Sequence, residues 1–138
     1  MNELVERNAE SLENNLVETN DSFCSFTADT PEDKAKLFRI MNSPAKRISD
    51  CINETILVKD VYCEKVQVIN KETGAINICP RIVLVDEKDI GYQCVSFGVF
   101  SSLKKLFQVY GLPTWEPGIP VKVKQITRDK NKILTLTI

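Results

Sequence analysis

The side chains of this sequence that could act chemically are cations and aromatic rings, and they do not form a catalytic set. Histidine is absent from the 138 residues. Its absence removes Ser-His-Asp and Cys-His nucleophilic sites and histidine ligation of metals. The phosphate-binding motifs G-x-x-x-x-G-K-S/T and G-x-G-x-x-G are missing as well. We therefore expect a protein that is not an enzyme and that uses no cofactor.

Cationic side chains offer one kind of chemistry, the binding of phosphates. The cations that lie on or between the expected strands are Lys71, Arg81, Lys88, Lys122, Lys124, Arg128, Lys130 and Lys132. Any one of them is best interpreted as ordinary solubilising charge. The collective excess of basic over acidic side chains in residues 34–138 is the stronger observation, and it predicts a surface that binds polyanions.

Charge also divides the chain into two parts. Residues 1–33 carry one basic and nine acidic side chains, a net charge of −8. Residues 34–138 carry 17 basic and 10 acidic side chains, a net charge of +7. The overall charge of −1 conceals this division. The pattern indicates a cationic body joined to an acidic N-terminal arm.

Aromatic rings offer the second kind of chemistry, because exposed rings stack on the bases that single strands present, at roughly 1 to 3 kcal/mol per base. The candidate stacking residues are Trp115, Tyr62, Tyr92 and Tyr110. For two of them, a structural role is supported about as well as stacking or better. Trp115, held between prolines, could instead cover the open end of a barrel, and Tyr110 lies on an apolar helical stripe that favours core packing. We assign Phe97, Phe100 and Phe107 to the core.

Cysteines and acidic clusters do not indicate a metal. The five cysteines are widely spaced and never form a C-x-x-C pair, so we expect buried free thiols. Residues 86–89 (DEKD) are interpreted as a charged turn, because a lysine within the cluster disfavours a cation. The sequence has no apolar run of about 18 residues and no basic, apolar start, and we expect a cytoplasmic protein that does not bind membranes.

Local signals predict the secondary structure. Thr30 and Pro31 begin a helix that runs to about Asn42. A β-branched stretch follows, with a bulge near Asp60. A second helix is capped by Ser101 or Ser102 and ends at Gly111. The expected strands are 55–69, 75–85, 92–97, 121–127 and 133–138, joined by turns at 70–74, 86–91 and 128–132.

This order of three strands, a helix and two strands is that of a five-stranded Greek-key OB-fold barrel. We therefore predict an all-β fold with helices, in which one helix lies between the third and fourth strands and another precedes the barrel. Another small barrel, or an open sheet with one covering helix, is the alternative. The expected division is an acidic arm over residues 1–29 and an OB-fold domain over residues 30–138.

The arm could serve assembly or nothing specific. Leu12 and Leu16 fall on one helical stripe, and Phe23 and Phe26 are rings that solvated tails seldom retain. We interpret these four residues as candidate subunit contacts, with packing of the two rings on their own domain as the alternative. The arm could also act as a DNA mimic that occupies its own groove.

A family resemblance supports this interpretation. Residues 45–138, most clearly 98–106 (GVFSSLKKL), 110–115 (YGLPTW) and 121–124 (VKVK), resemble small single-stranded DNA-binding proteins encoded by conjugative plasmids and phages of Gram-positive bacteria. The resemblance implies an OB fold without catalytic activity. It also implies single-stranded DNA binding with little sequence preference, subunits that associate along the strand, and a role in conjugation or in phage or plasmid replication.

The sequence thus predicts a non-catalytic binder of single-stranded DNA that associates with itself. RNA or duplex DNA could bind more weakly, since phosphate contacts and stacking do not by themselves read the 2′-hydroxyl. The alternative is an OB-type protein-interaction module whose groove accepts a peptide or another subunit.

Overall fold

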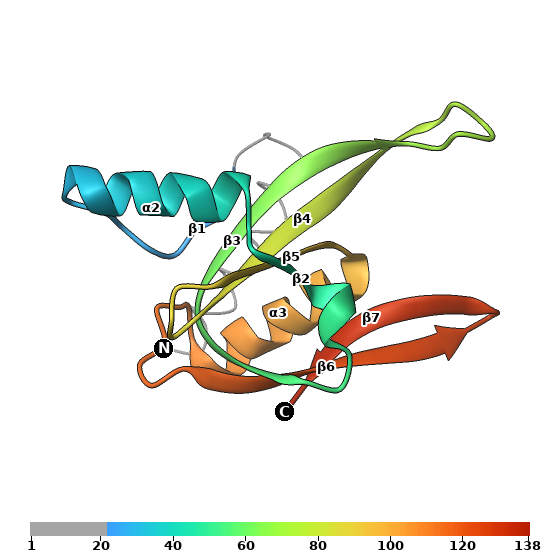
Figure 1. Ribbon diagram of the computed structural model, residues 1–138. Helices are drawn as coiled ribbons and strands as arrows, with labels where there is room; N and C mark the ends of the chain where they lie inside the picture. The colour runs from blue at the N-terminus through green and yellow to red at the C-terminus, as the bar shows by residue number, and fades with distance from the viewer. Residues whose placement is uncertain (1–21) are drawn as a thin grey trace.

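The computed structural model describes residues 22–138, whose strands form one curled, open sheet with two α-helices (Figure 1). The strand order is β2-β5-β4-β3-β6-β7, and β1 pairs with β3. The predicted succession of three strands, a helix and two strands is confirmed by β3 to β7. The elements are β1 (Phe23–Cys24), α2 (Pro31–Asn42), β2 (Lys46–Arg47), the 3-10 helix η2 (Ile48–Cys51), β3 (Thr55–Ile69), β4 (Ile76–Asp86), β5 (Gly91–Val95), α3 (Phe97–Tyr110), β6 (Ile119–Arg128) and β7 (Asn131–Thr137).

The long strand β3 curls the sheet. Its first residues, from Thr55 to Val58, pair with β6, and the residues from Val58 onward pair with β4. The register shifts between Val58 and Asp60, which confirms the predicted bulge. A bulge bends its strand and increases the local twist. The bent strand β3 can therefore pair with β6 at its beginning and with β4 along the rest of its length. The β3–β4 and β6–β7 hairpins both project from the body of the molecule (Figure 1).

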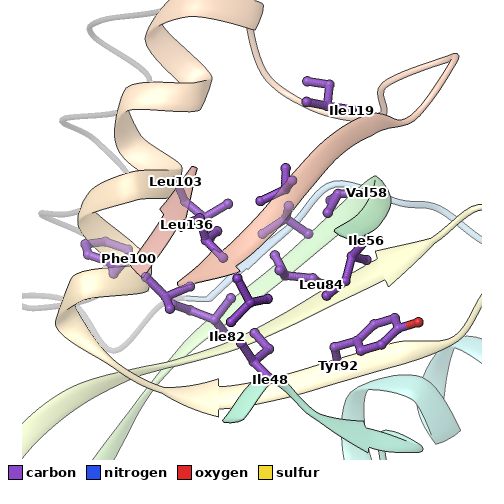
Figure 2. Close-up of a cluster of buried hydrophobic side chains, with 14 of the residues drawn as sticks. Ile48, Ile56, Val58, Ile82, Leu84, Tyr92, Phe100, Leu103, Ile119 and Leu136 are labelled. Atoms are coloured by element: carbon purple, nitrogen blue, oxygen red, sulfur yellow. The ribbon is translucent and has the colours of Figure 1, made fainter. Parts of the chain in front are cut away.

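Both faces of the sheet are covered. On the concave face, Ile82 and Leu84 of β4 pack with Leu103 of α3 in the main core (Figure 2). Their neighbours Val83 and Val85 point the other way and form a second cluster beneath α2. This alternation is the period-2 pattern of a strand that is buried on both sides.

Helix α2 begins and ends where the sequence predicts. The Thr30 hydroxyl accepts a hydrogen bond from the backbone N–H of Asp33 at 3.1 Å, and the last helical residue is Asn42. One ion pair attaches the helix, because Asp89 accepts from Lys36 at 2.7 Å, and Lys59 of β3 donates to the same carboxylate at 2.5 Å. These hydrogen bonds lower the pKa of Asp89 below its ordinary value.

The cap of helix α3 lies five or six residues before the predicted one. The Ser96 hydroxyl, rather than that of Ser101 or Ser102, accepts the capping hydrogen bond, from the backbone N–H of Val99 at 3.1 Å. The predicted third strand is correspondingly too long. The core assignment of Phe97 is wrong, because this first helical residue is 60% exposed.

Helix α3 also closes the space between β5 and β7, which do not pair. A Cβ atom at Gly98 would overlap the backbone carbonyl oxygen of Leu134. The Ser102 hydroxyl contacts the Thr135 hydroxyl at 2.9 Å and accepts from the backbone N–H of Leu136 at 3.2 Å. The described strands thus form a sheet whose open seam is bridged by a helix, and closure into a five-stranded barrel is not confirmed.

The last part of the N-terminal arm lies on its own domain. Phe23 packs against Phe107 with ring centroids 5.6 Å apart, and Phe26 joins the cluster beneath α2. Both rings are half-buried and pack within the chain, as the alternative interpretation had it, and a subunit contact through them stays a prediction. The other two suggested contacts, Leu12 and Leu16, lie outside the described residues.

Two turns and the thiols complete the fold. Gly74 has a φ of 71°, as its predicted turn requires. In the β6–β7 turn, Asp129 and Lys130 have φ values of 53° and 68°, the conformation typical of a two-residue type I′ hairpin. All five cysteines are free thiols. Among residues 22–138, no helix has the length and apolar character needed to cross a membrane.

Candidate nucleic-acid interface

Three of the four predicted stacking rings are buried. Trp115 and Tyr62 are each 6% exposed, and Tyr92 is 8% exposed. The expectation that they present a face to solvent is wrong. Trp115 packs against Phe107 with ring centroids 5.9 Å apart, and its indole N–H donates to the Gly111 carbonyl at 3.1 Å. It belongs to the main core, which neither the stacking role nor the alternative of a cover over a barrel end predicted.

Carboxylates hold the two buried tyrosines. The Tyr62 hydroxyl donates to Glu64 at 2.7 Å, and the Tyr92 hydroxyl donates to Asp86 at 2.9 Å. Burial and these hydrogen bonds raise the pKa of each phenol to about 12. Tyr92 is also covered by Lys46, whose Nζ lies 5.6 Å from the ring centroid. Their chemistry is therefore already used within the fold.

The fourth ring, Tyr110, is 49% exposed at the C-terminal end of α3. It lies about 20 Å along the helix from Phe97, at a rise of about 1.5 Å per residue. With Val109 and Ile138 it lines a mainly apolar hollow of about 340 Å³. Stacking by Tyr110 stays a prediction.

A larger hollow lies between the first half of α3 and the β6–β7 hairpin. It measures about 630 Å³ and is lined by residues 95–98, 101, 102 and 105 on one side and 126, 128 and 132–135 on the other. Three cations, Lys105, Arg128 and Lys132, line it together with the exposed ring of Phe97. We call this hollow the cationic groove.

The cationic groove is electrostatically suited to anions. None of its lining residues is acidic. The first turn of α3, which also lines it, carries no acidic residue either. A helix N-terminus has a partial positive charge that favours phosphates. The three side-chain charges and the helix end therefore add in one place.

The eight predicted phosphate contacts are spread over the molecule. Arg128 and Lys132 line the groove, and Lys130 is exposed in the turn between them. Lys71 is exposed in the β3–β4 turn, whereas Lys88 follows the other end of β4, about 33 Å away at about 3.3 Å per residue. The structure thus brings three of the eight together.

The other three are less available. Arg81 is ion-paired with Glu64 at 3.1 Å, and its side chain is 14% exposed. Lys122 and Lys124 are half-buried, and Lys124 donates to Asn53 at 3.2 Å.

Sequence reasoning missed Phe97 and Lys105. Their signal is a helical one, since Phe97, Ser101 and Lys105 recur every four residues and so share one face of α3. That face becomes recognisable only when Ser96 is taken as the cap. When a strand is predicted to end at Phe97, this residue and Lys105 are assigned to different elements and their common face is not recognised.

The acidic turn at residues 86–89 is fully used by the fold. Asp86 accepts from the backbone N–H groups of Lys88 and Ile90, and Glu87 accepts from that of Gly118 at 2.8 Å. Within residues 22–138, no three His, Cys, Asp or Glu side chains are grouped closely enough to hold a metal ion.

Comparison with known proteins identifies the class. Residues 17–138 match the phi29-phage type family described as phage single-stranded DNA-binding protein. The match covers most of the chain, and the chain belongs to this family. Its ligand class is therefore single-stranded DNA. No curated protein and no solved structure gives a significant match.

Proposed function

We propose that single-stranded DNA lies in the cationic groove, where Lys105, Arg128 and Lys132 bind its phosphates and Phe97 stacks on a base. The observation that carries this proposal is the meeting of three cations and an exposed ring in a hollow without acidic residues. Lys130 extends the cationic edge at the hairpin turn. A ring requires an unstacked base, so single strands bind better than duplexes.

The same features account for binding that is independent of sequence. Phosphate charge and a base's flat face are common to all nucleotides, so neither contact reads the sequence. We infer a non-catalytic protein of the OB type that coats single strands during phage or plasmid replication or plasmid transfer. The arm segment that holds Leu12 and Leu16 contacts the next subunit along the strand.

The salt dependence of binding tests the groove. Each phosphate neutralised on a single strand contributes about 0.7 to the slope of log affinity against log salt. Changing Lys105, Arg128 and Lys132 together to glutamine should lower the slope by about 2. The measurement is fluorescence anisotropy of a labelled oligothymidine at several salt concentrations.

Lys88→Gln provides the matched control, because it removes one exposed cation at the far end of β4. Its slope should equal that of the wild-type protein. An unchanged slope in the triple variant would place the phosphates elsewhere. Wild-type protein that failed to bind the oligomer at low salt would end the proposal.

A further inference from the structure

A second hollow lies on the outer face of the sheet, away from the main core. It measures about 440 Å³ and is lined by Phe38, Met41 and Asn42 of α2 and by Tyr62, Glu64, Arg81 and Gln93 of the sheet. The three strands β3, β4 and β5 form its floor, and α2 forms its rim. We call it the α2 hollow.

Phe38 is the unusual member of this hollow. Its ring is 65% exposed, although Phe is among the residues most often buried. Helix α2 has no buried residue and is attached through Ile40, Met41 and its ion pair. Packing of the helix therefore does not depend on this ring, and its flat face remains accessible beside a hollow.

The floor of the α2 hollow is polar and fixed. Arg81 donates to Glu64 at 3.1 Å and to Gln93 at 3.1 Å, and Glu64 also accepts from the Tyr62 hydroxyl at 2.7 Å. A guanidinium group has five N–H donors, and these two contacts use two of them. The glutamine amide contributes donors as well. An accessible ring above a held set of donors is an arrangement that suits the face and edge of a nucleobase.

The α2 hollow is connected to the cationic groove by exposed surface. Val95, which pairs with Arg81, is 48% exposed and lines the groove. Gln93 in one hollow and Phe97 in the other are four residues apart, a span of at most about 13 Å at about 3.3 Å per residue. One OB fold covers about 4 to 16 nucleotides, so a single strand is long enough to occupy both hollows.

We propose that the α2 hollow is a second base-binding subsite, in which Phe38 stacks on one nucleobase and Arg81 and Gln93 donate hydrogen bonds to its edge. The subsite rests on the proposed function, since it binds another base of the strand that the cationic groove holds. It extends the interface across β5 onto α2, the helix between β1 and β2.

The test compares oligothymidine of about 10 nucleotides, within the site size of one OB fold, with an abasic oligomer of equal length. Phe38→Ala should weaken oligothymidine binding by about 5- to 100-fold, which corresponds to the loss of one stacked base. Phe38→Trp should retain the affinity. Neither variant should change the affinity for the abasic oligomer or the slope with salt.

Val109→Ala is the matched control, because it truncates an exposed apolar side chain of α3, and Val109 lines neither the cationic groove nor the α2 hollow. Wild-type affinity of Phe38→Ala for oligothymidine would overturn the subsite, as would an equal loss for both oligomers. A changed oligomeric state at unchanged DNA affinity would also overturn it and assign Phe38 to a protein contact. Each of these results leaves the cationic groove standing, because that groove is tested by variants of its own lining residues.

Discussion

The cationic groove and the α2 hollow use the same residue types in opposite ways. In the groove, three cations face an exposed ring with no acidic residue among the lining. In the α2 hollow, the one cation is neutralised by Glu64, and the ring lies above a hydrogen-bonded floor. The first arrangement attracts any polyanion over a distance, whereas the second acts only at contact. Counting cations along the sequence therefore points to the cationic groove and not to the α2 hollow.

The largest effect is expected on the free energy of unfolding, at Gly98, which lines the cationic groove and not the α2 hollow. Gly98→Ala places a methyl group on the Leu134 carbonyl oxygen, where backbone must move. We expect a loss of about 3 kcal/mol in the free energy of unfolding, at the upper end of overpacking costs. Chemical denaturation measures it.

Gly74→Ala is the control for Gly98, since Gly74 has open space around it and a φ of 71°. It should cost only about 1 to 2 kcal/mol through its left-handed conformation. Equal losses at the two glycines would remove the argument that close approach of α3 and β7 shapes the groove.

Phe97→Ala gives the next largest effect, on binding. Loss of one stacked base should cost about 1 to 3 kcal/mol for oligothymidine and nothing for an abasic oligomer. Because Phe97 is 60% exposed, the melting temperature should stay near that of the wild-type protein. Anisotropy titration and thermal unfolding provide both readings. A reduced salt slope in this variant would show that it disturbs the neighbouring cations instead.

The smallest effect is expected at Asp89, which links Lys36 of α2 to Lys59 of β3. Its pKa in the folded protein is below the ordinary value of 3.8, so its contribution to stability is present above that pH and is lost as the pH falls through the folded pKa. Asp89→Asn should destabilise by up to about 1 kcal/mol at neutral pH, because the pairs are partly exposed.

Denaturation at a series of pH values checks this prediction. The difference between Asp89→Asn and the wild-type protein should shrink as the pH falls below 3.8. A difference that persists unchanged in acid would mean that the ion pairs do not hold the helix. The variant should weaken binding at the α2 hollow and leave the cationic groove intact.

Local chemistry made much of the fold predictable. The start of α2 depends only on the adjacent residues Thr30 and Pro31, which the sequence shows directly. The bulge is likewise marked by a change near Asp60 in the alternation of buried and exposed side chains. Gly74 likewise marks a turn, because glycine adopts the positive φ found there without steric cost. The start of α3 was missed because alternating apolar residues around Phe97 satisfy a strand as well as a helix.

The site was less predictable, because exposure depends on distant contacts. Trp115 is buried by Phe107, which belongs to another element, and Tyr92 is covered by Lys46 from a short strand. Nothing in their neighbouring residues reveals this. Arg128 and Lys132 were found from the hairpin sequence, whereas Phe38 carries no signal other than exposure in the folded chain.

The hydroxyl contacts between α3 and β7 have a consequence for the width of the cationic groove. Where a closed barrel would have a ladder of backbone hydrogen bonds, Ser102 meets Thr135 and Leu136 through a rotatable side chain. Separating these partners frees two hydroxyl groups and the backbone N–H of Leu136, to which water can bind, and unpairs no strands. A change in the width of the groove would therefore break side-chain hydrogen bonds and leave every described strand pairing in place.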